Sequence, residues 1–138
     1  MVSSDDELNE LLDGVHIAVL GTVDSRGRPH QVPIWYLWRD GGALLLTGRS
    51  SKKWRNILGN SNASLCVDTK ELPYVAAVLE GEAAEAPEIE YSPLLREMAI
   101  HYLGERAGSS GWGAKWSRYG VASVESESPR FGGCPAGR

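Results

Sequence analysis

The alternation of apolar and polar stretches along the chain predicts a mainly β protein. Six stretches are rich in apolar and β-branched residues and are separated by turn-forming residues, as expected of antiparallel strands. They are VHIAVLGTV (15–23), RPHQVPIWYLW (28–38), ALLLT (43–47), ASLCVD (63–68), YVAAVLEGEAAEA (74–86) and YGVASVE (119–125). The turns DSRG (24–27) and RDGG (39–42) are short enough to join the first three strands into a meander.

Three further segments have a helical pattern. Residues 5–12 place Leu8, Leu11 and Leu12 on one side. A second segment, capped by Ser50 or Ser51, places Trp54, Ile57 and Leu58 at positions i, i+3 and i+4. The third segment starts at Pro93 and runs to about residue 103. Consecutive antiparallel strands in so short a chain favour a barrel that is closed wholly or in part, because closure removes exposed edges. We therefore expect one domain over residues 1–125 and a tail, 126–138, that is loose or bound at an interface.

Charge and composition narrow the classes of protein that remain. The 138 residues carry a formal net charge of −4, which argues against a general nucleic-acid-binding or anionic-membrane-binding protein. No apolar run approaches the roughly 20 residues that span a bilayer, and the N-terminus lacks the pattern of a signal peptide. Cys66 and Cys134 form no disulfide or metal-binding pattern, so a cytoplasmic location is the default expectation.

One short segment gathers positive charge in this acidic chain. TGRSSKKWRNI (47–57) contains Arg49, Lys52, Lys53 and Arg55 at the start of the predicted second helix. Cations at a helix N-terminus oppose the helix dipole, whereas hydroxyls and free amides in the same turn suit an anion, of which phosphate is the commonest. The segment therefore indicates a phosphate-bearing small ligand, with a merely solvated charged face, or a patch that meets an acidic protein, as alternatives.

Residues 21–68 resemble the N-terminal half of the pyridoxamine 5'-phosphate oxidase-like FMN-binding split barrels. The likeness is closer to the flavin and deazaflavin (coenzyme F420) oxidoreductase branch than to the pyridoxamine phosphate oxidases themselves. It rests on an ordered set of motifs rather than on any single one. They are Thr22, DSRGRP (24–29), Tyr36, ALLLT, the set Ser51, Lys53, Asn56 and Ile57, then GNSNASLCVD (59–68), and Gly81 in the next strand.

The resemblance implies a homodimer of six-stranded antiparallel split β-barrels with short flanking helices and a cofactor site in each interface groove. It implies hydride transfer between FMN or F420 and a small organic substrate. The cofactor-binding positions are Ser51 and Lys53 at the phosphate, Arg49 and Lys52 beside it, Asn56 at the turn or ligand, Val32, Pro33, Ile34 and Trp35 along the ring, and Thr47 and Gly48 near the ring and its chain. The additional basic residues slightly favour the acidic-tailed F420.

The catalytic residue is not identified by the sequence. Tyr36 and His30 are candidates for a proton donor, and the three histidines do not have metal-ligand spacing. A non-catalytic carrier of flavin, haem or a bilin is the main alternative function. Pyridoxamine phosphate oxidase activity is a second alternative, although the tail offers only Arg130 and Arg138 and lacks that enzyme's expected pattern.

Overall fold

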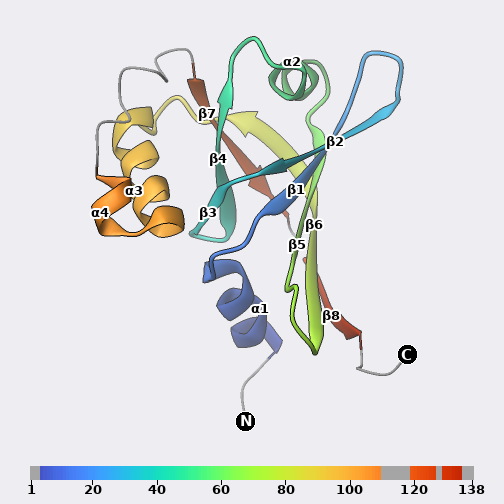
Figure 1. Ribbon diagram of the computed structural model, residues 1–138. Helices are drawn as coiled ribbons and strands as arrows, with labels where there is room; N and C mark the ends of the chain where they lie inside the picture. The colour runs from blue at the N-terminus through green and yellow to red at the C-terminus, as the bar shows by residue number, and fades with distance from the viewer. Residues whose placement is uncertain (1–3, 110–118, 127–128, 135–138) are drawn as a thin grey trace.

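The computed structural model describes residues 4–109, 119–126 and 129–134. These residues form a mainly β fold with four helices (Figure 1). The elements are α1 (Ser4–Asp13), β1 (Ala18–Val23), β2 (Pro29–Ile34), β3 (Tyr36–Arg39), β4 (Gly42–Gly48), α2 (Lys52–Gly59), β5 (Asn62–Asp68), β6 (Tyr74–Glu85), α3 (Tyr91–Leu103), α4 (Glu105–Gly108), β7 (Tyr119–Glu125) and β8 (Arg130–Cys134).

All strands belong to one antiparallel sheet in the order β2-β1-β5-β6-β7-β4-β3, with β8 paired to β6 outside this path. The two strands at the ends of this order, β2 and β3, are consecutive in the chain and are separated only by Trp35. The sheet must therefore curl until its two edges meet at Trp35, which produces a split barrel. Figure 1 shows this segment crossing the view from β2 to β3. The predicted mainly β fold, an antiparallel split barrel with flanking helices, is confirmed.

The number of strands differs from the six that the sequence predicts. The predicted strand over residues 28–38 is interrupted at Trp35, because its two halves pair with opposite ends of the sheet, β1 and β4. The predicted tail also contributes a strand, since Arg130–Cys134 pair with Tyr74–Val78 of β6. Phe131 packs against the core from this strand. This part of the tail is therefore neither loose nor outside the domain.

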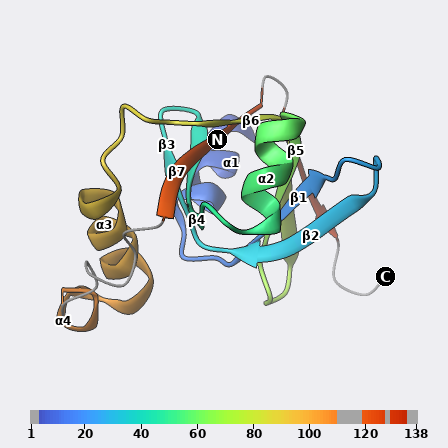
Figure 2. The ribbon, with the colours of Figure 1, turned by 90° about the horizontal axis from the view of Figure 1, so that it is seen from above.

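The main core fills the inside of the curled sheet, and two helices close its ends. Leu8, Leu11 and Leu12 of α1 enter the core from one end, and Trp54 and Ile57 of α2 enter from the other. Figure 2 shows α2 lying across the barrel when it is viewed from above. These are the apolar helix faces that the sequence predicts, except that Leu58, which the helical spacing also assigns to the α2 face, is 61% exposed.

A second apolar cluster lies outside the barrel, between the sheet and α3. In β4, Leu45 points into the barrel, whereas Leu44 belongs to the outer cluster with Leu94 and Met98 of α3. This alternation follows from the two-residue period of a strand. The packing of this outer cluster holds α3 in place beside β3, β4 and β7. In the described part of the chain, no helix is long and apolar enough to cross a membrane.

Candidate functional site

The start of α2 is held by a network of hydroxyl groups. The Ser51 hydroxyl donates to the Gly48 carbonyl (2.7 Å), accepts from the Trp54 amide (3.3 Å) and lies 3.1 Å from the Thr47 hydroxyl. The single proton of Ser51 is thus directed at a backbone carbonyl, and Thr47 is buried beneath it. Thr47, Gly48 and Ser51, which the sequence assigns to the cofactor, here build the N-cap of the helix.

The two adjacent lysines of α2 face different cavities. Consecutive helical residues are separated by about 100° around the axis, and Lys52 and Lys53 accordingly line separate sites. Lys52 points toward the β1–β2 turn, whereas Lys53 points toward β2 and α3. The basic segment is therefore not one patch.

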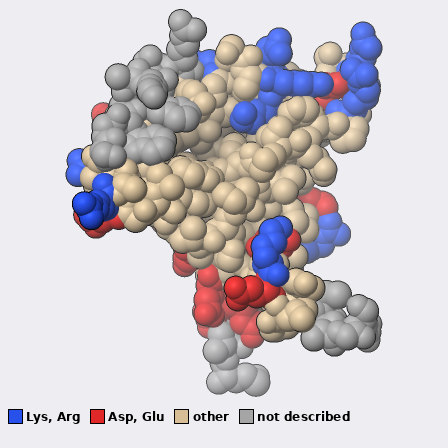
Figure 3. Space-filling model, in the orientation of Figure 1, with Lys and Arg blue, Asp and Glu red and all other residues tan. Residues whose placement is uncertain are grey.

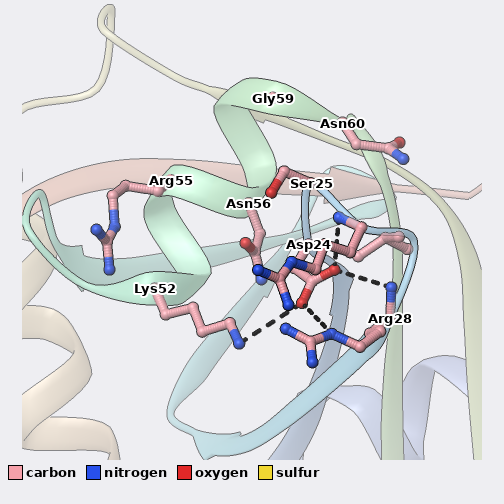
Figure 4. A pocket seen from close by; sticks show the side chains of 10 residues that line it. Asp24, Ser25, Arg28, Lys52, Arg55, Asn56, Gly59 and Asn60 are labelled. Carbon is pink, nitrogen blue, oxygen red and sulfur yellow. Dashed lines mark hydrogen bonds and ion pairs between the residues drawn. The ribbon is translucent and has the colours of Figure 1, made fainter.

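The first cavity, the turn pocket, has a volume of about 670 Å³. It is lined by Val23, Asp24, Ser25, Arg26, Arg28, Lys52, Arg55, Asn56, Gly59 and Asn60. The Asp24 carboxylate accepts from the amides of Arg26 and Arg28 (both 2.9 Å) and from the Arg28 guanidinium (3.1 Å). The Lys52 ammonium lies 3.8 Å from the same carboxylate, and Arg55 points away from this cluster (Figure 4).

Asp24 acts as the turn pocket's own anion. The hydrogen bond from the Arg28 amide is the main cause that lowers the pKa of this carboxyl group below its ordinary value. Asp24 therefore stays ionised beside Arg28 and Lys52 at neutral pH. Part of the positive charge in the pocket is offset without any ligand.

The second cavity, the edge groove, has a volume of about 440 Å³ and is mostly apolar. It is lined by Ile17, Pro33, Ile34, Trp35, Leu46, Lys53, Leu95, Met98 and Tyr119. Four of the predicted cofactor-binding residues meet here: Pro33, Ile34, Trp35 and Lys53. Within the described ranges the Lys53 ammonium forms no ion pair, so it faces this apolar space without a carboxylate partner.

Three other predicted cofactor-binding residues have partners inside the protein. The Arg49 guanidinium forms an ion pair with Glu85 (2.9 Å) and lies over the Trp54 ring, 5.1 Å from its centroid. The Asn56 amide donates to the Thr22 hydroxyl (3.1 Å) in a buried contact that ties α2 to β1. Val32 packs against the main core. None of the three lines the edge groove.

The two candidates for a proton donor also lie elsewhere. Tyr36 is buried, its hydroxyl donates to the Leu12 carbonyl (2.8 Å), and burial raises its pKa well above the ordinary value. A substrate in the groove cannot reach this proton, so Tyr36 is a core residue. His30 lies opposite Thr22 in the β1–β2 ladder, and its Nδ1 is buried without a hydrogen-bond partner among the described residues. Neither residue lines the edge groove.

The α3 side of the groove is not evident from the sequence. Leu95 and Met98 form this wall, and Tyr102 stacks on Trp35 with ring centroids 4.5 Å apart and an interplanar angle of 4°. The helical spacing of these residues indicates only that α3 has a buried face. Which part of the barrel it covers is set by tertiary packing.

The curled antiparallel sheet and the groove at its edge strand define a split-barrel protein. A family model described as pyridoxamine 5'-phosphate oxidase matches residues 4–120. The chain therefore belongs to the pyridoxamine 5'-phosphate oxidase family, as the motifs in residues 21–68 indicate. A sequence search of curated proteins finds no significant match.

Solved structures share the fold at low sequence identity. A putative pyridoxamine 5'-phosphate oxidase from Listeria innocua is 14% identical, with a TM-score of 0.74 over 94% of this chain and 98% of that one. An FAD-binding protein from Mesorhizobium loti is 20% identical, with a TM-score of 0.68 over 94% of each chain. A heme-binding protein from Mycobacterium smegmatis is 19% identical, with a TM-score of 0.73 over 100% of this chain but only 57% of that protein.

Proposed function

We propose that this protein is an oxidoreductase that transfers hydride between a flavin or deazaflavin cofactor in the edge groove and a small organic substrate. The observation that carries the proposal is the position of Lys53, which has no ion-pair partner among the described residues, at an apolar groove formed by β2, α2 and α3. A flat ring with a phosphate at one end suits such a site. The apolar walls can contact the ring, and the Lys53 ammonium on α2 can bind the phosphate. A cytoplasmic location belongs to the same proposal.

The residues of the groove fit such a cofactor in three respects. The Lys53 ammonium would hold the phosphate through a charge-assisted hydrogen bond. In the described sheet β2 pairs only with β1, so its other edge can offer backbone groups to the polar side of a ring. Trp35, Ile34 and Met98 would exclude water from the ring faces. The bound cofactor would supply the hydride chemistry, and the chain would position and desolvate it.

A second copy of the chain is part of the proposal. One row of register partners crosses β2, β1, β5 and β6 and consists of Pro33, Val19, Cys66 and Val78. Val19 is 39% exposed and Ile17, which also lines the groove, is 47% exposed. Figure 3 shows a broad surface over β1 and β2 with few charged side chains. We propose that a homodimer covers this row and completes the groove beside it.

Titration with FMN and riboflavin tests the role of Lys53. Riboflavin lacks the phosphate, so Lys53→Ala should weaken binding of FMN by roughly ten- to a hundredfold, the range for a hydrogen bond to a charged group, and leave riboflavin binding unchanged. Lys52→Ala is the matched control, because it removes the same charge one residue away but faces the turn pocket. Equal FMN affinities for wild type and Lys53→Ala would remove Lys53 from the site.

The same titration, repeated with F420, distinguishes the two candidate cofactors, FMN and F420. The additional basic residues favour F420 only if their charge is available to its acidic tail. Arg49 pairs with Glu85, and Lys52 lies near Asp24, so two of them are already offset in part. Their contribution should therefore be small, and Arg49→Ala should change the ratio of F420 to FMN affinity by less than threefold.

The homodimer is tested by changing the exposed row. Val19→Lys should give a monomer by sedimentation analysis and weaken cofactor binding, since it places a charge in the proposed interface. Leu72→Lys, on a residue that is 61% exposed between β5 and β6, is the control and should leave both unchanged. A wild-type protein that is monomeric at high concentration would refute the dimer.

A non-catalytic carrier of flavin, haem or a bilin is the second candidate. It is favoured by the position of Tyr36 and His30, neither of which lines the groove as a proton donor would. The two functions are separated by turnover. A carrier would bind its ligand without turnover. With any added electron acceptor, the reduced cofactor bound to a carrier would be reoxidised no faster than the free reduced cofactor.

A further inference from the structure

Trp35 occupies an unusual place in the sheet. It is the one residue between β2 and β3, and it belongs to neither the β1–β2 ladder nor the β3–β4 ladder. The sheet therefore does not fix its orientation. Another element has to do so if its indole is to form a wall of the edge groove.

Tyr102 of α3 supplies this support through its ring. The Tyr102 ring is parallel to the Trp35 indole, with centroids 4.5 Å apart. His101 meets Tyr102 edge-on at 5.1 Å, and its Nε2 lies 3.2 Å from the Gly14 carbonyl. The stack is thus anchored on α3 and covers one face of Trp35.

The Tyr102 hydroxyl ties together the two chain segments that flank the groove. It accepts from the Tyr36 amide (3.1 Å) and donates to the His16 carbonyl (2.6 Å), with the Tyr36 carbonyl at 3.2 Å as a weaker second acceptor. Burial raises the pKa of Tyr102, so the hydroxyl keeps its proton at neutral pH. The bonded segments carry Trp35 and Ile17, which lie on the groove.

We infer that Tyr102 is a positioning residue that orients Trp35 as a flat wall for the ring of the bound cofactor. The inference rests on the proposed function and adds a residue that does not itself line the groove. A side chain that is already held in place loses little conformational entropy when a ligand binds. If the ligand has to immobilise that side chain, the entropy lost weakens binding by about two- to tenfold.

Two substitutions separate the ring of Tyr102 from its hydroxyl. Tyr102→Phe keeps the stack and loses the hydrogen bonds, and Tyr102→Leu loses both. With FMN as the probe, we expect Tyr102→Leu to weaken binding by about two- to tenfold and Tyr102→Phe to weaken it less. Tyr36→Phe is the control, because it also removes a buried hydroxyl but leaves the stack intact. FMN affinity equal to wild type in Tyr102→Leu would overturn the inference.

A measurement without ligand distinguishes this inference from the proposed function. In protein labelled with fluorotryptophan, the Trp35 fluorine resonance is assigned by its loss in Trp35→Phe. It should be a single line in wild type and Tyr102→Phe and should shift or broaden in Tyr102→Leu. An unchanged line in Tyr102→Leu would refute the positioning role. If the wild-type protein shows the expected single line but binds neither FMN nor F420, the proposed cofactor is refuted and the positioning role of Tyr102 is not.

Discussion

Replacing Tyr36 by phenylalanine separates a structural role of its hydroxyl from a catalytic one. The hydroxyl donates to the Leu12 carbonyl, which belongs to the last turn of α1 and has no partner within the helix. Tyr36 is only 1% exposed. In Tyr36→Phe the carbonyl loses its donor in a place that water does not reach.

The expected cost follows from this burial. A buried acceptor left without its donor costs about 1–3 kcal/mol. For a domain of this length, this corresponds to a fall in Tm of roughly 3–10 °C. The raised pKa of Tyr36 means that the hydroxyl stays protonated in the folded protein. The stability difference between wild type and Tyr36→Phe should therefore be constant below about pH 10 and shrink above it, as the unfolded tyrosine loses its proton.

Urea denaturation and cofactor titration together provide the assay. Both proteins are compared at one protomer concentration, because a dimer's stability depends on it. We expect lower stability with FMN affinity and turnover unchanged for the folded protein. Wild-type stability combined with a large loss of turnover would refute the assignment of Tyr36 to the core and restore it as a candidate acid.

Three further changes test the surrounding structure. Asp24→Asn should lower Tm at pH 6. The difference in Tm from wild type should disappear as the pH falls below 3.8, because the lowered pKa of Asp24 contributes stability only while the carboxylate is ionised. A difference that does not depend on pH would contradict this. Ser51→Ala should cost about 0.5–2 kcal/mol as a lost helix cap without changing FMN affinity, and a loss as large as that of Lys53→Ala would show that the hydroxyl contacts phosphate. Gly81→Ala should cost about 1–3 kcal/mol or more, since the new Cβ would lie 1.8 Å from the Glu125 carbonyl oxygen. Gly59→Ala, in α2 with open space around it, should instead stabilise the protein by up to about 1 kcal/mol in the same denaturation experiment.

Most of the order of strands and helices could be predicted because local pattern determines it; the short helix α4 (Glu105–Gly108) could not. The apolar runs identify β1, β4 and β7, and the spacing of Trp54 and Ile57 identifies α2. Pro33 in this segment indicates an edge, a bulge or an interrupted ladder, and the strand is interrupted two residues later. The exact break at Trp35 could not be predicted, because the apolar pattern continues through it and only the meeting of the two sheet edges requires it. The strand β8 has a weak pattern of its own and forms because β6 offers it an edge.

The site was predictable only in part, for a similar reason. The sequence places Lys53 near Pro33, Ile34 and Trp35 through a family resemblance, and the structure brings these four together. It cannot show that Arg49 meets Glu85, because 36 residues separate them in the chain. It also cannot show which face of α2 is turned to the groove, since that depends on how the helix docks.

The pairing of cations changes the physical case for a bound anion. Four basic side chains at the start of a helix suggest that an anion offsets their charge. In the structure Arg49 and Lys52 have the carboxylates of Glu85 and Asp24 nearby, so an added anion gains less from them. Lys53 faces an apolar groove, where a charge interacts more strongly than in water because the local dielectric constant is lower. The fourth cation, Arg55, lines the turn pocket and not the groove. The free energy available to a phosphate in the groove is therefore concentrated on Lys53, and Lys53→Ala should remove nearly all of the difference between FMN and riboflavin binding.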